Sequence, residues 1–486
     1  MRDGVLAGQT ESLSEKGERP LYRAVDGPIL KRLEEIVGPK SIFSDEETLQ
    51  TYSHDETIGL SHRPEVVVKT TSLEEIREVL QLADFENVPV TPRGKGTGLS
   101  GGAVPFYGGI VLSCEKMERI IDIDHENLMV ITEPGIITGE LQKAVETEGL
   151  FYPPDPASLD SCSIGGNVAE GAGGSRAVKY GTTKDYVNGL NVVLPSGEGM
   201  HTGGKVVKDV TGYNLTQLLV GSEGTMVVVT QIILRLIPLP KLRRDLLVPY
   251  HSIDQAARTV SEIIQAKIVP TAIEFMENNS FELAEAFTQR ELSFRNAAAH
   301  VLIALDGNQS EALDEEQNRV GEICEKNGAY DVLIANTPSA RVRMWEGRKC
   351  LFEAANRVGS MYKSLDVVVP RSLIPVLIQK VNEASARYRI KVMSFGHAGD
   401  GNVHVLLFKG ELTDEEWDRQ IQQAQRTIYQ ETIHLGGKIT AEHGIGLLRK
   451  PFLSMNLDAH QIELFKRLKV AFDPKNILNP GKIFDL

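Results

Sequence analysis

Two glycine-rich stretches decide the fold: Pro92-Arg-Gly-Lys-Gly-Thr-Gly98 and Cys162-Ser-Ile-Gly-Gly-Asn-Val-Ala-Glu-Gly-Ala-Gly-Gly174. They belong to a region, Gly94 to Gly224, that holds 24 of the 44 glycines of the chain. Turns in an all-β region would space glycines at regular intervals, whereas these glycines cluster. Because glycine has no side chain to cover the backbone, we expect both stretches to approach a ligand closely.

The first stretch overlaps a weak match to the Rossmann fingerprint. Gly96-Thr-Gly98-Leu-Ser-Gly101 fits G-x-G-x-x-G, but residues 102–109 continue as a loop instead of opening a helix. Successive backbone N–H groups, with the cations Arg93 and Lys95, suit a pyrophosphate. The second stretch suits a flat ring system. Together they predict a long ligand with a diphosphate in its middle, for which a dinucleotide is the natural candidate.

The residues before the first stretch have the pattern of a β-α-β unit. Residues 65–70 and 88–92 read as strands, and the capping box Ser72-Leu-Glu-Glu75 opens an amphipathic helix between them. Further strands are expected at residues 109–113, 128–132, 189–194 and 226–236, and a short helix at 141–148.

Beyond Pro238-Leu-Pro240 the pattern changes to helices that alternate with strands. We expect helices at residues 253–266, 281–293 and 310–327, and a strand at 300–305. This pattern resembles a sheet with helices on one face, and it places the main domain boundary near residues 236–241.

The composition of the 486 residues is that of a soluble globular protein of two to three domains, since 41% are hydrophobic and 24% are charged. The net charge of −14 disfavours nucleic acid as a partner. The sequence contains neither an apolar run of about 18 residues that could span a membrane nor the apolar core of a signal peptide.

The four cysteines, Cys114, Cys162, Cys324 and Cys350, are scattered, and no two form a C-x-x-C pair. This spacing excludes a disulfide scaffold, a zinc ribbon built from cysteines and an iron–sulfur cluster held by this chain alone. We therefore expect a reducing, cytoplasmic environment.

Two histidines flank a turn signal in Phe395-Gly-His397-Ala-Gly-Asp-Gly-Asn-Val-His404. A two-residue turn at Asp400-Gly401 would pair His397 directly with His404 across a hairpin, with Cβ atoms about 4.5–5.5 Å apart. Two imidazoles at that spacing can share one metal ion.

A third element, Thr440-Ala-Glu442-His443-Gly-Ile-Gly446, adds a carboxylate and another histidine beside flexible glycines. Two histidines and a carboxylate would leave positions on a metal open for substrate, as in a catalytic site. On spacing alone, a hydrogen-bonded histidine cluster without a metal remains the alternative.

These motifs resemble the FAD-binding domain of the vanillyl-alcohol-oxidase family, and most closely its D-2-hydroxy-acid dehydrogenase branch, which acts on glycolate, D-lactate or D-2-hydroxyglutarate. The resemblance rests on residues 92–102, 153–156, 164–174, 180–181 and 219–224 and extends from about residue 25 to the C-terminus. It implies an α+β fold, with a two-subdomain FAD-binding domain of vanillyl-alcohol-oxidase type and an α+β cap domain for the substrate.

The resemblance divides the chain into four segments. We expect a flexible tail over residues 1–24, the FAD-binding domain over 25–240, the substrate or cap domain over 241–437, and a C-terminal segment over 438–486 that returns to the flavin site. The positions implied to bind FAD are Arg93, Gly94, Lys95, Gly96, Thr97, Gly98, Ser100, Gly101, Pro154, Asp155, Ser158, Ile164, Gly165, Gly166, Asn167, Ala169, Gly173, Gly174, Tyr180, Gly181, Glu223, Gly224 and Asn479.

The same resemblance implies that FAD is bound noncovalently, because Thr97 stands where some members attach the flavin through a histidine. Cys162 is an alternative attachment point, but a buried cysteine packed in the core is the preferred interpretation.

The branch pattern also implies roles in the substrate site. His397, His404 and Glu442 match ligands of one divalent metal, which zinc, manganese or iron would suit. The residues that match catalytic or substrate-binding positions are His443 as the general base, Arg348 for the substrate carboxylate, Asn402, and Lys363. Phe352 stands where the hydroxyglutarate enzyme has a threonine, which favours a smaller acid such as glycolate or lactate.

The expected activity is therefore FAD-dependent oxidation of a small D-2-hydroxy acid to the 2-oxo acid, with hydride transfer to flavin N5. Two alternatives are an FAD transferase like alkyl-dihydroxyacetonephosphate synthase and a non-catalytic subunit that relays electrons through FAD. Electrons would pass to an acceptor such as an iron–sulfur or second flavin subunit, and the chain could form oligomers.

Overall fold

The first glycine stretch follows directly on a parallel strand, β3 (Val90–Arg93). In the computed structural model, which describes residues 22–289, 296–358 and 361–486, β3 and β2 (Val66–Lys69) flank β4 (Ile110–Ser113), and both run parallel to it. Helix α4 (Leu73–Glu86) connects β2 to β3, which confirms the predicted β-α-β unit. Most of the predicted tail, residues 1–24, lies outside the described residues.

The capping box of α4 forms only in part. Ser72 Oγ accepts a hydrogen bond from Glu75 N (3.2 Å), as predicted. The Glu75 carboxylate, however, accepts from Thr71 N (2.6 Å) and not from Ser72 N, so the reciprocal bond is displaced by one residue. The helix start is nonetheless where the sequence indicated.

The first subdomain is completed by β1 (Ile42–Phe43), which pairs with β2. Helices α2 (Gly27–Val37) and α4 pack on this sheet through a buried apolar core that includes Ile29, Leu33 and Val79. The short helices η1 (Pro39–Ser41) and α3 (Glu46–Thr51) complete this part.

The second subdomain is an antiparallel five-stranded sheet in the order β5 (Ile120–Asp124), β6 (Met129–Thr132), β10 (Val228–Arg235), β8 (Val187–Val193) and β9 (Gly199–Gly203). Helices α5 (Thr138–Thr147) and α6 (Ile164–Glu170) belong to its core through Leu141 and Ile164. The smaller elements are β7 (Leu150–Phe151), α7 (Ala177–Tyr180), η2 (Thr183–Asp185), α8 (Leu215–Leu219) and β11 (Ile237–Pro238).

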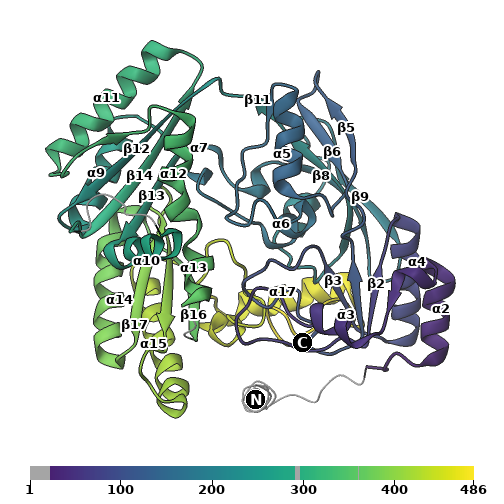
Figure 1. Ribbon diagram of the computed structural model, residues 1–486. Helices are drawn as coiled ribbons and strands as arrows, with labels where there is room; N and C mark the ends of the chain where they lie inside the picture. The colour runs from purple at the N-terminus through teal and green to yellow at the C-terminus, as the bar shows by residue number, and fades with distance from the viewer. Residues whose placement is uncertain (1–21, 290–295, 359–360) are drawn as a thin grey trace.

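The cap domain forms the other lobe in Figure 1 and is built on an antiparallel seven-stranded sheet. Its strand order is β15 (Leu333–Ile334), β12 (Leu242–Tyr250), β14 (Ala299–Gly307), β13 (Ala272–Glu277), β17 (Lys391–His397), β18 (Asn402–Phe408) and β16 (Tyr362–Val368).

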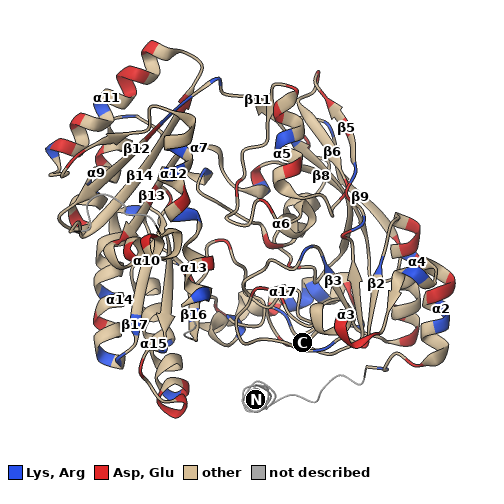
Figure 2. Cartoon of the chain, in the orientation of Figure 1, with Lys and Arg blue, Asp and Glu red and all other residues tan. Residues whose placement is uncertain are grey.

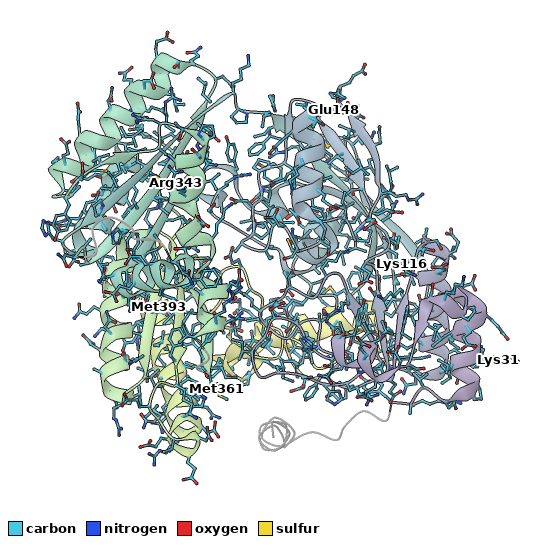
Figure 3. All side chains as sticks on the ribbon, in the orientation of Figure 1. Lys31, Lys116, Glu148, Arg343, Met361 and Met393 are labelled. Atoms are coloured by element: carbon cyan, nitrogen blue, oxygen red, sulfur yellow. The ribbon has the colours of Figure 1, made fainter. Side chains whose placement is uncertain are left out.

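Helices cover both faces of the cap sheet, so the expectation of helices on one face was wrong. The physical reason is visible in β13 and β18, which are buried at every position and therefore need cover on both sides. One face packs on α9 (Ile253–Gln265), α11 (Ser310–Lys326), α14 (Ile374–Tyr388) and α15 (Asp414–His434). The other packs on α10 (Asn278–Thr288), α12 (Pro338–Lys349) and α13 (Leu351–Arg357), with Met393 of Figure 3 in that core.

Charge is distributed unevenly over the cap. Figure 2 shows acidic residues along α11, which faces away from the FAD-binding lobe. Among the described residues, none of the helices combines the length and the apolar character needed to span a bilayer.

Residues 438–486 run from the cap sheet to the first subdomain. Thr440 forms a bridge with Asp366 of β16, and Leu478 forms a parallel bridge with Val90 of β3. Between these points lie η4 (Lys450–Phe452), α16 (Leu453–Asn456) and α17 (Ala459–Phe472), the last drawn in yellow beneath the FAD-binding lobe in Figure 1.

A buried lysine secures this segment. Lys469 of α17 is 3% exposed, and its ammonium donates to Thr225 O (2.6 Å), Leu478 O (2.8 Å) and the carboxylate of Asp473. All three of its hydrogens are thereby used, which compensates for the loss of water.

We expect Lys469→Met to lower the free energy of unfolding by about 3–5 kcal/mol, because it leaves Asp473 buried without its cation. Urea denaturation followed by circular dichroism measures the change. Arg467→Met, at an exposed position of the same helix, is the control and should cost less than about 1 kcal/mol. Equal losses in the two variants would contradict this account of the C-terminal segment.

Candidate active site

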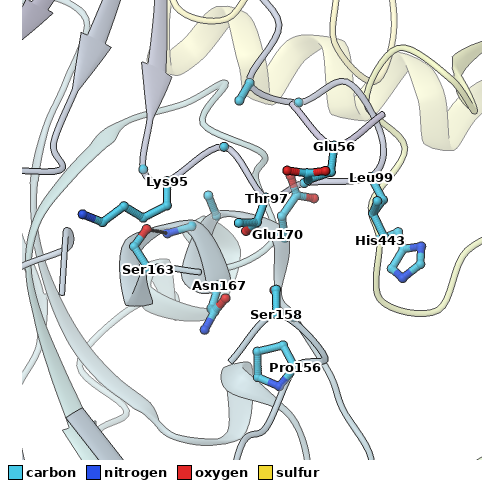
Figure 4. Close-up of a pocket in the computed structure, with 18 of the residues that line it drawn as sticks. Glu56, Lys95, Thr97, Leu99, Pro156, Ser158, Ser163, Asn167, Glu170 and His443 are labelled. Atoms are coloured by element: carbon cyan, nitrogen blue, oxygen red, sulfur yellow. Dashed lines mark hydrogen bonds between the residues drawn. The ribbon is translucent and has the colours of Figure 1, made fainter. Parts of the chain in front are cut away.

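A cavity of about 610 Å³ lies between the two glycine stretches and the cap. Figure 4 shows Lys95 and Thr97 of the first stretch, Ser163 and Asn167 of the second, and His443 at the side opposite Lys95. Cavities of this size, with apolar walls and a few converging polar groups, are typical of cofactor sites.

The glycines of both stretches are required by close contacts around this cavity. A Cβ atom on Gly94 would lie 2.2 Å from Ser163 Oγ, so the two stretches touch each other. A Cβ on Gly173 would lie 2.4 Å from Glu442 Oε2, so the second stretch also touches the candidate metal site. Side chains at these two positions would clash with protein atoms, so the close packing requires glycine there.

Most of the predicted cofactor residues line the cavity. They are Arg93, Gly94, Lys95, Gly96, Thr97, Gly98, Ser158, Gly165, Gly166, Asn167, Ala169, Gly173, Glu223 and Gly224. The other predicted residues, which lie outside the described cavity lining, are Ser100, Gly101, Pro154, Asp155, Ile164, Gly174, Tyr180, Gly181 and Asn479.

Three of the predicted residues that do not line the cavity form hydrogen bonds that support its walls. Asp155 accepts a hydrogen bond from Arg176 N (2.9 Å), and Asn479 Nδ2 donates to Gly102 O (2.9 Å) and Glu223 O (2.8 Å). Tyr180 donates to Asp306 of β14 (2.9 Å), which links the FAD-binding domain to the cap.

Arg93 has a supporting role that its charge did not suggest. Its guanidinium donates to His54 O (2.7 Å) and lies directly below Gly96, where a Cβ would be 2.0 Å from Nη2. Burial lowers the pKa of Arg93. Lys95 also lines the cavity (Figure 4) and is the second cation of this stretch.

Sequence reasoning missed two acidic residues in the cavity, Glu56 and Glu170. Burial, together with the neighbouring carboxylates of Glu223 and Asp55, raises the pKa of Glu170 well above its usual range. Glu170 ends α6 within the second glycine stretch, so its position in that stretch was the signal available.

The histidine hairpin differs from the predicted register. Residues 398–401 form a four-residue loop, so His397 pairs with Asn402, and His404 pairs with Phe395. The two-residue turn fails because Gly399 N bonds to Ile273 O (3.2 Å) on the neighbouring strand and holds the loop open. The register shift is two residues, which keeps both histidines on one face.

His397 and His404 are therefore diagonal neighbours, with ring centroids 5.3 Å apart. Three imidazole nitrogens face one carboxylate oxygen, Glu442 Oε1: His397 Nε2 at 3.3 Å, His404 Nε2 at 3.5 Å and His443 Nε2 at 3.8 Å. All four side chains line the cavity.

Electrostatics at this cluster favour a cation. Burial alone would raise the pKa of Glu442, but His397 and His404 lower it to about 2. Burial lowers the pKa of His404 well below its usual range. Burial would also lower the pKa of His397, but the carboxylates of Glu274 and Glu442 raise it well above its usual range. An ionised carboxylate and a neutral imidazole are the forms that bind metals.

Asp366 also belongs to this cluster, because it offers an oxygen within 4.8 Å of ligand atoms of His404, Glu442 and His443. Its oxygens are already occupied, however. Oδ2 accepts from Thr440 Oγ1 and from the backbone N–H groups of residues 441–443, and Oδ1 accepts from Asn402 Nδ2 (2.9 Å). Asp366 is thus better suited to hold the loop than to bind a metal.

Arg348 lies on the cap side of the same cavity and is 6% exposed. Its guanidinium forms an ion pair with Glu274 (2.8 Å) and stacks over the Phe395 ring at 4.9 Å. Its Nε is buried and has no hydrogen-bond partner among the described residues, so one donor of the guanidinium is unpaired.

Further cap residues line the cavity on the same helical face as Arg348. Phe352 and Asn356 follow at intervals of four residues, and Lys349 and Glu353 lie beside them. The i, i+4 spacing from Arg348 through Phe352 was the signal that could have found Asn356, and the same spacing joins Lys349 to Glu353.

Lys363 lies on the other face of the cap sheet. In β16, Tyr362 lines the cavity, whereas Leu365 and Val367 belong to the core against α14 and α15. Strand alternation places Lys363 with the latter, and burial there lowers its pKa. The structure therefore does not bring Lys363 into the cavity. Asn402 is 3% exposed and bonds to Asp366 behind the histidines.

Comparison with known proteins identifies the family. Residues 64–203 match an FAD-binding domain, and residues 239–483 match the C-terminal domain of FAD-linked oxidases. The chain belongs to the FAD-linked oxidase family. The expected α+β fold of vanillyl-alcohol-oxidase type is thereby confirmed, and the chain is an FAD-linked oxidoreductase.

Two curated relatives of this FAD-linked oxidase match nearly end to end. The glycolate oxidase subunit GlcD of Bacillus subtilis is 41% identical over 94% of this chain and 96% of its own length. D-lactate dehydrogenase of Anaerostipes hadrus is 37% identical over 95% of this chain and 98% of its own. A solved alkyldihydroxyacetonephosphate synthase shares the fold at a TM-score of 0.73 and 18% identity, covering 97% of this chain and 87% of its own.

We expect Gly94→Ala to weaken FAD retention by at least about tenfold, because the new methyl group forces the two glycine stretches apart at Ser163. The absorbance of flavin relative to protein after gel filtration measures the loss. Gly199→Ala is the matched control, since no described atom outside its chain neighbours lies within 4 Å of a Cβ there. Full FAD content in Gly94→Ala would contradict the packing described above.

Proposed function

We propose that this FAD-linked oxidoreductase oxidises a small D-2-hydroxy acid, glycolate or D-lactate, to the 2-oxo acid. One observation carries the proposal: Arg348, the three histidines and Glu442 line the same cavity as the glycine stretches. The relatives named for glycolate and D-lactate support it.

Arg348 would bind the substrate carboxylate. Its unpartnered Nε is already dehydrated, so a carboxylate can bond to it without displacing a protein partner. The planar guanidinium favours a two-point contact, which would orient the α-carbon and the hydroxyl within the cavity.

His397, His404 and Glu442 would hold one divalent metal, zinc, manganese or iron. Two imidazoles and a carboxylate suit all three ions and leave positions open. Such an ion would lower the pKa of a substrate hydroxyl. The residues fit because their ligand atoms already converge on Glu442 Oε1.

His443 would act as the general base for the substrate hydroxyl. Its ring stacks on His404 with centroids 5.2 Å apart, and its Nδ1 is buried without a hydrogen-bond partner in the described structure. A proton can therefore be accepted at this ring without breaking an existing bond. Noncovalently bound FAD supplies the acceptor of the hydride from the α-carbon.

Phe352 would restrict the substrate to a small acid. Its ring contacts Phe395, His404 and His443, with centroid distances of 5.3, 5.5 and 6.1 Å. It thus occupies space beside the proposed base and offers no donor to a second carboxylate.

A second protein would accept the electrons. The four cysteines are free and three of them are buried, so an iron–sulfur relay would lie on another chain. An iron–sulfur or second flavin subunit would serve. We also propose a reducing compartment, the cytoplasm, for a chain with these unpaired thiols.

The two alternative functions, an FAD transferase and an electron-relay subunit, would require different residues in the cavity. An FAD transferase shares the fold but does not oxidise its substrate, and a relay subunit has no need of His443 in turnover. Neither explains why four histidine and glutamate side chains converge beside Arg348.

We expect glycolate or D-lactate, added anaerobically to the purified holoenzyme, to bleach the flavin absorbance band. D-2-hydroxyglutarate should bleach it at least about tenfold more slowly, because Phe352 leaves less room and no second anchor. Treatment with a chelator should abolish the bleaching, and Zn²⁺ or Mn²⁺ should restore it.

The variant His443→Ala should retain FAD and bleach about 10²–10⁴-fold more slowly. An unchanged bleaching rate would remove His443 as the general base. A yellow protein that none of the three acids bleaches would favour the transferase or the relay subunit, and a protein that takes up no FAD would overturn the proposal altogether.

We expect Phe352→Thr to raise the kcat/KM ratio of D-2-hydroxyglutarate to D-lactate by about 10-fold or more, since it opens space and adds a hydroxyl. Steady-state assays with an artificial electron acceptor measure both values. Val342→Thr, an exposed position on α12, should leave the ratio unchanged. A ratio in Phe352→Thr equal to that of the wild type would remove Phe352 from substrate selection.

A further inference from the structure

The proposed metal site and the proposed substrate arginine share one buried carboxylate. Glu274 lies in β13 directly opposite His397 of β17, and its side chain is 1% exposed. Oε1 lies 2.6 Å from His397 Nδ1, and Oε2 lies 2.8 Å from an Arg348 amino nitrogen. Sequence patterns gave no reason to select Glu274, since it lies within an apolar strand.

We propose that Glu274 is a positioning residue that orients His397 for metal binding and Arg348 for substrate binding at the same time. The inference rests on the function proposed above and extends it to a residue that lies behind the cavity wall.

The contact with His397 selects a tautomer. A neutral imidazole whose Nδ1 faces a carboxylate at 2.6 Å carries its one proton there, so the lone pair is on Nε2, the form that a bound metal requires. That Nε2 faces Glu442 Oε1 at 3.3 Å, where the metal would bind. Without Glu274 the ring could rotate or place its proton on Nε2, and the metal would lose a ligand.

The contact with Arg348 sets the direction of the guanidinium. One amino nitrogen is held by Glu274, the plane stacks on Phe395 at 4.9 Å, and Nε is left for the substrate. Arginine has rotamer freedom that binding would otherwise have to remove, so this restraint lowers the entropy cost of substrate binding.

Glu274→Gln in the FAD-loaded protein tests the proposal, because glutamine keeps the shape but cannot hold both groups by charge. Zn²⁺ affinity, measured against a competing chelator, should fall about 10–100-fold. KM for the acid that bleaches the wild type should rise at least tenfold, whereas FAD content should not change. Glu277→Gln, also buried in β13, is the matched control and should leave Zn²⁺ affinity and KM unchanged.

Glu274→Asp should recover part of the Zn²⁺ affinity because it restores the charge. Unchanged Zn²⁺ affinity and KM in Glu274→Gln, with a lower denaturation midpoint alone, would reduce Glu274 to a structural ion pair and overturn the proposal. A wild type that binds no Zn²⁺ would also overturn it. If no hydroxy acid bleaches the wild type, the proposed function fails, while the Zn²⁺ comparison still tests the effect of Glu274 on His397.

Discussion

The buried carboxylate of Asp366 holds the loop on which the rest of the site depends. Its Oδ2 accepts hydrogen bonds from Thr440 Oγ1 (2.8 Å) and from the backbone N–H groups of Ala441, Glu442 and His443, each at 2.9 Å. Burying a carboxylate costs several kcal/mol, and bonds to a charged group offset this at about 1.5–3 kcal/mol each. Movement of the loop would therefore leave the buried Oδ2 of Asp366 without its donors, and this restraint fixes the backbone that carries Glu442 and His443.

The FAD-binding domain holds the same loop from its other end. Glu223 accepts hydrogen bonds from Ile445 N (2.7 Å) and Gly446 N (2.6 Å), and Asn479 in turn bonds to Glu223 O. Residues 440–446 are thus attached by one carboxylate to the cap and by another to the FAD-binding domain. The distance between His443 and the glycine stretches is consequently set by how the two domains pack, and neither domain alone forms the site.

Local signals were sufficient to predict the β-α-β unit, whereas Arg348 and most of the predicted cofactor residues followed only from the family resemblance. Local signals were insufficient where register depends on neighbours. The Asp400-Gly401 signal favours a two-residue turn, but a third strand, through Ile273 O, holds Gly399 and produces a four-residue loop. The predicted direct pairing of His397 with His404 was wrong, but the two histidines still lie on one face because strand faces alternate with a period of two. A shift of one residue would have separated them.

The two halves of the site differ in how far the sequence reveals them, and the reason is physical. The cofactor half is formed largely by the backbone of the two glycine stretches. A cluster of glycines can be recognised in the sequence without knowledge of the residues that it contacts. The cap half is shaped by buried carboxylates whose partners are distant, as with Glu274, which is 123 residues from His397. Phe352 belongs to neither network, since its contacts are ring to ring. A change there alters the space for substrate without disturbing a buried charge, so substrate size can vary independently of the proposed metal and base.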